Sequence, residues 1–395
     1  MSATYSSTEM AGRKHGGNLQ AAAAIANCSP DDILDFSASL NPLGPPQSVW
    51  QAISNARKAV IRYPDPHCMR LRQALSKHYG IDPDWIVPGN GAAELFTWAA
   101  RSCARLGTTL IPQPAFSDYA RALDAVDAPW EGIACWQDVS GDRAGEDAAR
   151  GAAGNNTTGQ IADLGAAIRD RLSQPEPPTC LILTNPHNPT GHLWTVAQLQ
   201  DIIPHFQLVI LDEAFMDFVD PNQSLLPWLA RYPQLAIVRS LTKFYAIAGL
   251  RIGFAVTHPE RGQQWQRWRD PWSVNGLATE AAVVALEDRT FQKRTLQWLP
   301  PARQQLRQGI HDIDGCLASE SQANFLLVNI DRSVTALQEK LLKNHRMLIR
   351  DCLSFQHLGD RFFRVAVRSE AENLKLLRSL RLEVSRLSVQ LTFHE

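Results

Sequence analysis

One lysine occupies a position that does not suit a solvated surface side chain. Lys243 follows the apolar run AIVRSL and precedes the glycine-rich continuation AIAGLRIGF. A lysine that folding buries shifts its pKa readily, and the neutral amine can form a Schiff base with a carbonyl compound. Ser240 and Arg251 flank this lysine, and both side chains can hold a phosphate group. The segment therefore indicates Schiff-base chemistry beside a phosphate site.

An aspartate ends another apolar run. Asp212 belongs to LDEAF, residues 211–215, directly after the strand-like segment LVI. A carboxylate buried at such a strand end is costly unless a cation or a hydrogen-bond donor pairs with it. A protonated pyridine nitrogen would be a suitable partner. A helix-capping aspartate without a chemical role is the alternative that this motif alone leaves open.

Two loops rich in glycine and proline could complete an anion site. GNGAAEL, residues 89–95, is a turn that opens a helix, and the free amides and dipole of a helix start attract phosphate. TNPHNPTG, residues 184–191, follows a strand and contains two Asn-Pro steps. These steps force an irregular loop at the carboxyl end of the strand, where open α/β sheets bind ligands. Each loop alone could also be a structural turn.

Short apolar runs alternate with amphipathic stretches between about residues 49 and 256. The alternation predicts a mostly parallel sheet with helices on both faces, which is an α/β fold. The expected strands are 110–113, 180–184, 208–211, 236–241 and 252–257, and the expected helices between them include 94–104 and 196–203. A long helical zone at 277–313 precedes two more strands, at 324–330 and 362–367, which a helix at 334–343 separates.

These patterns divide the chain into three regions. Residues 1–45 are expected to form an N-terminal arm that packs with the second domain, because the segment DFSASLNPLGPP is rich in proline and glycine. Residues 46–275 form the large ligand-binding domain, and residues 276–395 form a smaller α+β domain. The polar, glycine-rich segment 140–159 is expected to be a surface insertion.

The composition gives no support for several kinds of partner. A formal net charge of -1 offers no attraction to nucleic acid or to an anionic membrane surface. The first residues, MSATYSSTEMAG, lack the features of a secretory signal, and no apolar run approaches the ~18 residues that span a bilayer. The seven cysteines are scattered and never form a CxxC pair, so we expect reduced thiols in the cytoplasm and no metal ligation.

Together, in this order and spacing, the four motifs resemble the cofactor-binding core of pyridoxal-phosphate (PLP)-dependent aminotransferases of fold type I. The resemblance covers nearly the whole chain except the segment 140–159, and it implies that the large domain binds PLP. By this resemblance, Lys243 holds pyridoxal 5′-phosphate covalently, Asp212 pairs with its pyridinium nitrogen, and Asn188 donates to the ring 3′ oxygen. The resemblance assigns the cofactor phosphate to Ser240, Arg251 and the amides of Gly91 and Ala92.

Two aromatic residues match further features of the same family. Phe116, in QPAFSDY, lies where the family places an aromatic ring against the face of the cofactor. Tyr63, in RYPDP, matches a tyrosine that reaches the phosphate of the neighbouring subunit, so the resemblance implies a homodimer. One position departs from the pattern. Related enzymes often carry DEAY, whose tyrosine also bonds the 3′ oxygen, and Phe215 stands there in this chain, so that oxygen should depend more on Asn188.

The reaction must be inferred from segments outside the core, because PLP supplies the electron sink and the protein decides which bond breaks. The opening HGGN and the phrases PWSVNGLA and FRVAVRSEAEN resemble L-threonine O-3-phosphate decarboxylases, as do LDFSASLNPLGPP, KFYAIAGLR, QANFLLV and LIRDC. This resemblance implies a lyase that releases (R)-1-amino-2-propanol O-2-phosphate for cobalamin biosynthesis. The nearer alternative is a histidinol-phosphate aminotransferase. A PLP-dependent transcriptional regulator is more distant, since such proteins usually carry an N-terminal DNA-binding helix-turn-helix.

A phospho-amino acid presents a carboxylate and a phosphate, so cationic and donor side chains should bind it. Arg364 lies in the strand where relatives bind the substrate carboxylate, and Arg350 and Arg368 offer further fork-shaped donors. The alternatives are an edge position in solvent for Arg364 and a plain surface position for Arg368. Further substrate candidates, from the arm, are His15, Asn18 and Asn41, although the first two could also serve only as an N-terminal cap.

Overall fold

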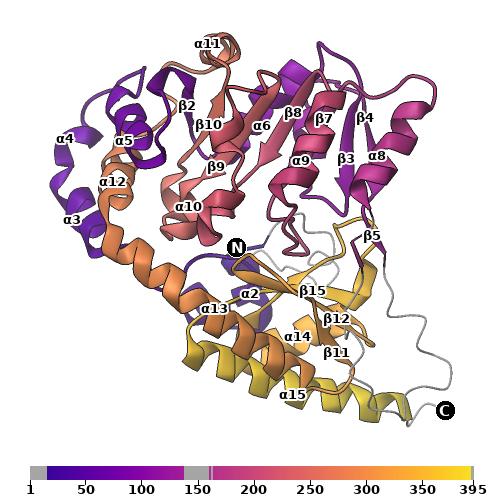
Figure 1. The fold of residues 1–395 in the computed structure, drawn as a ribbon. Coiled ribbons are helices and arrows are strands. Elements are labelled where there is room, and N and C mark those ends of the chain that lie inside the picture. Colours follow the sequence, from indigo (N-terminus) through magenta and orange to yellow (C-terminus); the bar gives the residue numbers. More distant parts are fainter. Residues whose placement is uncertain (1–15, 138–159, 162, 393–395) are drawn as a thin grey trace.

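The computed structural model describes residues 16–137, 160–161 and 163–392. The insertion predicted at 140–159 and the candidate residue His15 lie outside the described residues. Within them, a larger sheet with its helices lies above a smaller sheet with helices of its own (Figure 1). None of the described helices combines the length and the apolar character needed to cross a bilayer.

The larger sheet has seven strands in the order β2-β10-β9-β8-β7-β3-β4. They are β2 (Ile86–Gly89), β3 (Thr109–Gln113), β4 (Trp130–Ala134), β7 (Cys180–Thr184), β8 (Leu208–Asp212), β9 (Leu235–Ser240) and β10 (Gly253–Thr257). The run from β9 to β4 is parallel, whereas β10 is antiparallel to both of its neighbours. The predicted α/β fold with a mostly parallel sheet is therefore confirmed.

All five strands predicted for this sheet are present, with ends that differ by at most one residue. Two strands of this sheet were not predicted, and they are its two edge strands, β2 and β4. β2 contains Pro88 and ends at Gly89, and the residues of β4 are half-buried or exposed. Edge strands tolerate proline, glycine and polar residues, so their sequences lack the continuous apolar run of a buried strand.

Successive residues of each central strand face opposite sides of the sheet. In β8, Val209 and Leu211 belong to one hydrophobic cluster, whereas Ile210 belongs to the other. The first cluster includes residues of α5 (Met69–Tyr79), α8 (Leu164–Ser173), α9 (Val196–Ile202) and α12 (Gly276–Glu287), and the second includes residues of α6 (Ala92–Cys103), α7 (Asp118–Asp124) and α11 (Pro259–Trp268). Because side chains alternate along a strand, neighbouring residues at a strand end point to different faces.

The smaller sheet is antiparallel, with the strand order β11-β12-β15-β14. Its strands are β11 (Cys316–Ala318), β12 (Phe325–Ile330), β14 (Arg350–Asp351) and β15 (Phe362–Ala366), and its helices are α13 (Arg289–His311), α14 (Val334–His345) and α15 (Glu370–Thr392). The N-terminal arm contacts this layer, since β1 (Leu34–Asp35) pairs with β13 (Met347–Leu348) and α2 (Leu19–Ala26) packs on α14. Two short strands, β5 (Trp136–Gln137) and β6 (Gln160–Ile161), form a separate pair.

The predicted helical zone 277–313 consists of two helices, α12 and α13, with Asp288 capping the second. α12 packs against α3 (Gln47–Asn55), α4 (Arg57–Val60) and α5, which are helices of the large layer (Figure 1). This packing favours a domain boundary near Asp288, one helix later than the boundary predicted at residue 276. The division into domains remains a proposal.

Candidate active site

A cavity of about 320 Å³ lies where the arm, the large sheet and the small sheet meet. Nine of the predicted site residues line it: Ala92, Phe116, Asn188, Asp212, Ser240, Lys243, Arg251, Arg350 and Arg364. They come from segments that are far apart in the sequence, and most follow the carboxyl ends of strands in the large sheet. Open α/β sheets bind ligands at this edge, so the cavity lies where the fold predicts a site.

Lys243 lies on the short helix α10 (Leu241–Phe244), which begins directly after β9. Its side chain is half-buried and reaches the cavity. Burial and the positive charges of Arg364 and Arg251 lower the pKa of its amine to about 8, although the carboxylate of Asp212 acts in the opposite direction. A substantial neutral fraction at mildly alkaline pH is what Schiff-base chemistry requires of a lysine.

Asp212 is the last residue of β8, and its carboxyl group is buried beside the cavity. One oxygen, Oδ2, accepts a hydrogen bond of 2.5 Å from the hydroxyl of Tyr119, and Oδ1 accepts one of 2.8 Å from the amide of Ala214. Burial nevertheless raises the pKa of Asp212 to about 6. A carboxylate in this state gains from any cation that enters the cavity, so the site favours a protonated nitrogen at this position.

The phosphate side of the cavity is built from a helix start, two hydroxyls and an arginine. α6 begins at Ala92, and Ala92 and Ala93 both line the cavity, so its first-turn amides lie at the cavity wall. Ser240 Oγ is 2.6 Å from Thr242 Oγ1, and both residues line the cavity. Arg251 adds the positive charge that a phosphate needs.

Gly91 has a different position from the predicted one. Its amide donates to the carbonyl oxygen of Gly89 at 2.8 Å, and Gly91 is not among the described residues that line the cavity. Its φ of +78° is one that glycine adopts without strain, and a Cβ there would lie 2.6 Å from Nη2 of Arg251. The positive φ is therefore what requires glycine here, and the prediction that its amide binds phosphate does not fit this geometry.

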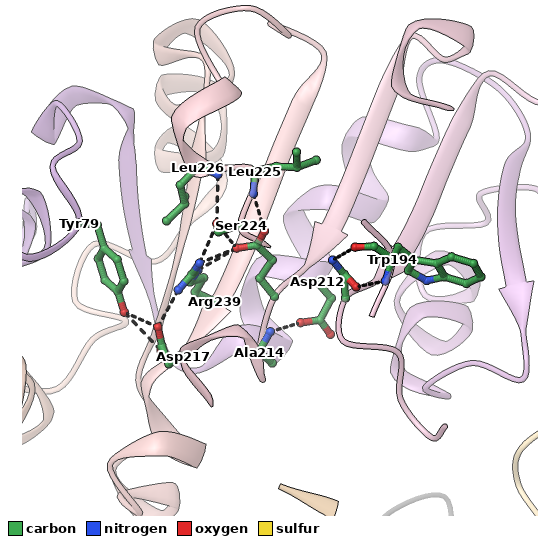
Figure 2. Close-up of polar contacts among 11 residues, drawn as sticks. Tyr79, Trp194, Asp212, Ala214, Asp217, Ser224, Leu225, Leu226 and Arg239 are labelled. Atoms are coloured by element: carbon green, nitrogen blue, oxygen red, sulfur yellow. Dashed lines mark hydrogen bonds and ion pairs between the residues drawn. The ribbon is translucent and has the colours of Figure 1, made fainter. Parts of the chain in front are cut away.

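The loop that carries Asn188 is closed by a pair of hydrogen bonds between Asn185 and the backbone of Trp194, at 3.1 and 2.9 Å (Figure 2). Within this loop, Asn188 Oδ1 accepts a hydrogen bond of 2.5 Å from Nη1 of Arg364. Nη2 of Arg364 donates to the carbonyl oxygen of Ser37 at 3.3 Å. Asn188 and Arg364 thus form one continuous donor surface on the cavity wall.

Arg350 and Arg364 are direct cross-strand partners on β14 and β15. Both are buried, with exposed fractions of 4% and 8%, so the solvent-exposed edge position considered for Arg364 is wrong. Burial, together with the neighbouring positive charge of Arg350, lowers the pKa of Arg364 to about 10. Like charges directly opposite each other destabilise a sheet, so this pair predicts that the cavity receives anions.

The arm forms one wall of the cavity through Gly16, Ser37, Ala38 and Ser39. Two predicted arm residues lie elsewhere. Asn18 caps α2 by accepting the amide of Ala21, which is the cap role that the sequence left open. Asn41 is buried and does not line the cavity. Its side-chain amide donates to the carbonyl oxygen of Phe244 at 2.9 Å, and its backbone N–H donates to the carbonyl oxygen of Lys243 at 3.1 Å.

Asn41 therefore holds the backbone around Lys243, a contact that does not fit the substrate contact expected of it. Arg368 also lies outside the cavity lining, and it donates to the carbonyl oxygen of Asp35 at 3.0 Å and to Glu372 at 2.7 Å. It thereby ties the arm to the small layer. Tyr63 is 80% exposed, its ring lies 4.5 Å from that of Trp272, and it is not among the described residues that line this cavity.

Sequence reasoning missed several residues of the cavity. Tyr119, which donates to Asp212, had no signal beyond its place in the quoted segment QPAFSDY, three residues after Phe116. Thr242 precedes Lys243 directly and could have been named with Ser240 as a second hydroxyl. Ser37 belongs to the quoted phrase DFSASLNP, but nothing in that phrase indicates that its carbonyl oxygen meets Arg364.

The donor set fits pyridoxal 5′-phosphate. The amine of Lys243 can bind an aldehyde, Asp212 can pair with a ring nitrogen, and the α6 start with Arg251 can hold a phosphate. A sequence model of the class I and II aminotransferases matches residues 31–380. The chain therefore belongs to this family, whose cofactor is pyridoxal 5′-phosphate.

Within the family, the chain is 37% identical over 373 residues to the threonine-phosphate decarboxylase of Salmonella typhimurium, covering 93% of this chain and 95% of that protein. It is 30% identical over 357 residues to the histidinol-phosphate aminotransferase of Methylobacillus flagellatus, covering 89% of each chain. Among solved structures, the histidinol-phosphate aminotransferase of Clostridium acetobutylicum has a TM-score of 0.77 and 27% identity, covering 90% of this chain and all of that one.

Proposed function

We propose that this protein is a PLP-dependent lyase that decarboxylates L-threonine O-3-phosphate to (R)-1-amino-2-propanol O-2-phosphate for cobalamin biosynthesis. The observation that carries the proposal is the pair of buried arginines, Arg350 and Arg364, which face the same cavity as Lys243. A substrate with both a carboxylate and a phosphate would present an anionic group to each of these two arginines. The 37% identity to a threonine-phosphate decarboxylase supports the same substrate.

The charge of the cavity supports an anionic substrate beyond the cofactor itself. Nε of Arg364 is buried and has no hydrogen-bond partner among the described residues, although its other two nitrogens are bonded. Arg350 donates to Ser354 Oγ at 2.7 Å, and the carboxylate of Asp351 lies 3.7 Å away. A buried cation with an open donor gains strongly from a bound carboxylate or phosphate, because such charge-assisted bonds replace a lost hydration shell.

The residues of the cavity suit a decarboxylation. When bound, PLP withdraws electrons from the α-carbon of an amino acid, which weakens every bond to that carbon. Arg364, oriented by Asn188, would hold the substrate carboxylate in one direction and so select the bond that breaks. Lys243 Nζ, whose pKa is lowered to about 8, can deliver a proton to the α-carbon after carbon dioxide leaves. Arg350 is left to bind the substrate phosphate.

We assign the cofactor contacts in the same way. Lys243 would hold PLP covalently, Asp212 would pair with the ring nitrogen, and Asn188 would donate to the 3′ oxygen. Phe116, which packs edge-on against Tyr119 at 5.7 Å between ring centroids, would lie on the ring face. The cofactor phosphate would be bound by Ser240, Thr242, Arg251 and the amides of Ala92 and Ala93.

The proposed assembly is a homodimer in which Tyr63 reaches the neighbouring site. Several large apolar side chains are exposed around Tyr63, a concentration that is unusual on a monomer surface: Val60 at 68%, Ile61 at 80% and Trp272 at 49%. A second copy of the chain would cover them. The proposed compartment is the cytoplasm, because all seven cysteines are free thiols and six of them are buried.

The test is a direct comparison of two reactions with the purified holoenzyme. One assay follows carbon dioxide and amine release from L-threonine O-3-phosphate, and the other follows amino transfer from histidinol phosphate to 2-oxoglutarate. We expect the first to be faster, and L-threonine to be poorer than its phosphate ester by roughly 10³-fold, since the unphosphorylated substrate leaves buried donors unpaired. Faster amino transfer from histidinol phosphate would move the function to the aminotransferase alternative.

A further inference from the structure

A buried charge network lies beside Asp212 and Ala214 (Figure 2). Arg239 and Glu213 are 3% and 1% exposed, and they form an ion pair of 2.6 Å between Nη2 and Oε2. Nε of Arg239 also donates to Glu213 Oε2 at 3.0 Å, and Nη1 donates to Asp217 Oδ1 at 2.6 Å. All three guanidinium nitrogens are therefore engaged with carboxylates.

The two carboxylates of the network are held by further donors. Glu213 accepts the hydroxyl of Ser224 at 2.8 Å and the amide of Leu225 at 3.0 Å. Asp217, in the 3₁₀ helix η5 (Met216–Phe218), accepts the hydroxyl of Tyr79 at 3.1 Å. The guanidinium of Arg239 also lies over the ring of Tyr79, 5.1 Å from its centroid. The network thus has little freedom to move relative to α5 and η5.

The members of the ion pair are the sequence neighbours of two residues that line the cavity. Glu213 follows Asp212 at the end of β8, and Arg239 precedes Ser240 at the end of β9. These strands are adjacent and parallel, and the amide of Glu213 donates to the carbonyl oxygen of Val238 at 2.8 Å. Because side chains alternate along a strand, the ion pair points away from the cavity while Asp212 and Ser240 point toward it.

We propose that Arg239 and Glu213 are positioning residues, which lock the carboxyl ends of β8 and β9 together and so set the spacing between Asp212 and Ser240. Asp212 would bind the cofactor ring and Ser240 would bind its phosphate. The ion pair would therefore fix the distance between two residues that hold one ligand. A site of this kind loses rate steeply when a group moves by about 1 Å.

Stabilisation of the core alone is a weaker explanation of this pair. The rest of β8 and the preceding residues of β9 are apolar and buried, and an apolar pair would fill the same space without desolvating two charges. Charged, directional groups occur in these strands only where the strands end beside the cavity. Bonds with fixed geometry specify a register better than apolar contacts, which tolerate sliding.

The test uses the holoenzyme with Arg239→Lys, which keeps the charge but removes the fork, and with Glu213→Asp, which shortens the carboxylate arm. The stability control is Ile237→Val, because Ile237 lies two residues earlier in β9 on the same face of the sheet. The chemical control is Arg171→Lys, whose arginine pairs with Glu131 on the edge strand β4 at 2.6 Å; neither residue lines the cavity. Cofactor dissociation is measured from the loss of visible absorbance, together with its pH dependence.

We expect both test variants to raise the cofactor dissociation constant by about tenfold or more and to shift the pH midpoint of the absorbance. The kcat should fall while the KM for substrate stays within about twofold, because the substrate arginines come from the other sheet. Both controls should leave these values unchanged even where Ile237→Val lowers the melting temperature. The inference is overturned if the test variants lose thermal stability and keep wild-type cofactor affinity and absorbance. These readouts depend on the cofactor and not on the proposed substrate, so the two proposals can fail separately.

Discussion

The ends of β8 and β9 carry charged side chains on both faces of the sheet, and the two faces differ in how these charges are satisfied. On the cavity face, burial raises the pKa of Asp212 and lowers the pKa of Lys243, so each group is displaced toward its neutral form. On the opposite face, burial would lower the pKa of Arg239, but the carboxylates of Glu213 and Asp217 outweigh it and hold that pKa above its ordinary value.

The difference shows how one short stretch of backbone can be both rigid and reactive. The paired face stabilises the strand ends, while the cavity face retains charges that the apoprotein does not satisfy fully. Such groups are expected at sites that bind ligands, because a ligand of the right charge removes the penalty. Substitutions on the two faces should therefore change stability in opposite directions.

The largest effect is expected from Lys243→Ala on the cavity face. Without the amine, covalent attachment of the cofactor and proton delivery to the α-carbon are both lost, so turnover should fall by about 10³-fold or more. Borohydride reduction of the wild-type holoenzyme should fix the cofactor to the peptide that contains Lys243 and bleach the visible band. A labelled peptide containing any other lysine would remove the basis of the whole site.

Asp212→Asn should raise the activation barrier by several kcal/mol, because an amide cannot hold the proton of a ring nitrogen. The rate should fall about tenfold for each ~1.4 kcal/mol. The same change should stabilise the apoprotein. The pKa of Asp212 rises from 3.8 to about 6 on folding, so above pH 6 its charge destabilises the fold by about 3 kcal/mol.

This penalty disappears as the pH falls from 6 toward 3.8, since Asp212 is then protonated in both states. The advantage of Asp212→Asn in urea unfolding of the apoprotein should therefore be full at pH 8 and absent near pH 4. An unchanged unfolding midpoint at pH 8, together with near wild-type turnover, would make Asp212 a structural residue.

Glu213→Gln is the matched change on the opposite face, one residue further along the chain. It should destabilise the apoprotein by about 3 kcal/mol at pH 8, because it leaves Arg239 buried with only part of its negative partner charge. Urea unfolding of the two amide variants side by side tests the comparison directly. If both variants shift in the same direction, the two faces do not differ as described.

Tyr119→Phe should have the smallest effect, about 1 kcal/mol, because it removes one hydrogen bond to Asp212 and leaves the amide of Ala214 in place. The lost bond favours the ionised carboxylate, so the pKa of Asp212 should rise further. In the Tyr119→Phe background, the stability gap to Asp212→Asn should still open near pH 4, where the unfolded chain ionises, but it should keep growing to a higher pH before it levels off. A gap that levels off at the wild-type pH would show that Tyr119 does not act on Asp212.

Much of the site could be predicted from the sequence because its central groups are defined locally. Asp212 and Ser240 each end an apolar run, and Lys243 begins the next turn, so strand periodicity alone places them at one edge of a parallel sheet. The five central strands were predicted for the same reason. The edge strands β2 and β4 were not, because Pro88 and Gly89 interrupt the apolar pattern of β2 and the residues of β4 are half-buried or exposed.

The remaining features depend on contacts between segments far apart in the chain. Neither the pairing of Arg350 with Arg364 nor the contact of Tyr119 with Asp212 is visible in the local sequence. Asn18 and Asn41 show the converse, since residue type suggested ligand binding whereas the fold uses them as a helix cap and a backbone anchor.

By itself, the sequence predicted the family and the lysine proposed to hold the cofactor through its resemblance to known members, and it predicted the strand ends that carry the chemistry through residue order and periodicity. Only the tertiary structure decided which charges are paired and which remain open. On one face, Tyr79 of α5 and Asp217 of η5 contact the network of Arg239, and on the other, the small sheet brings Arg350 and Arg364 to the cavity. Charge pairing requires atoms within a few ångströms, and periodicity along one segment contains no information about which distant segment will supply them.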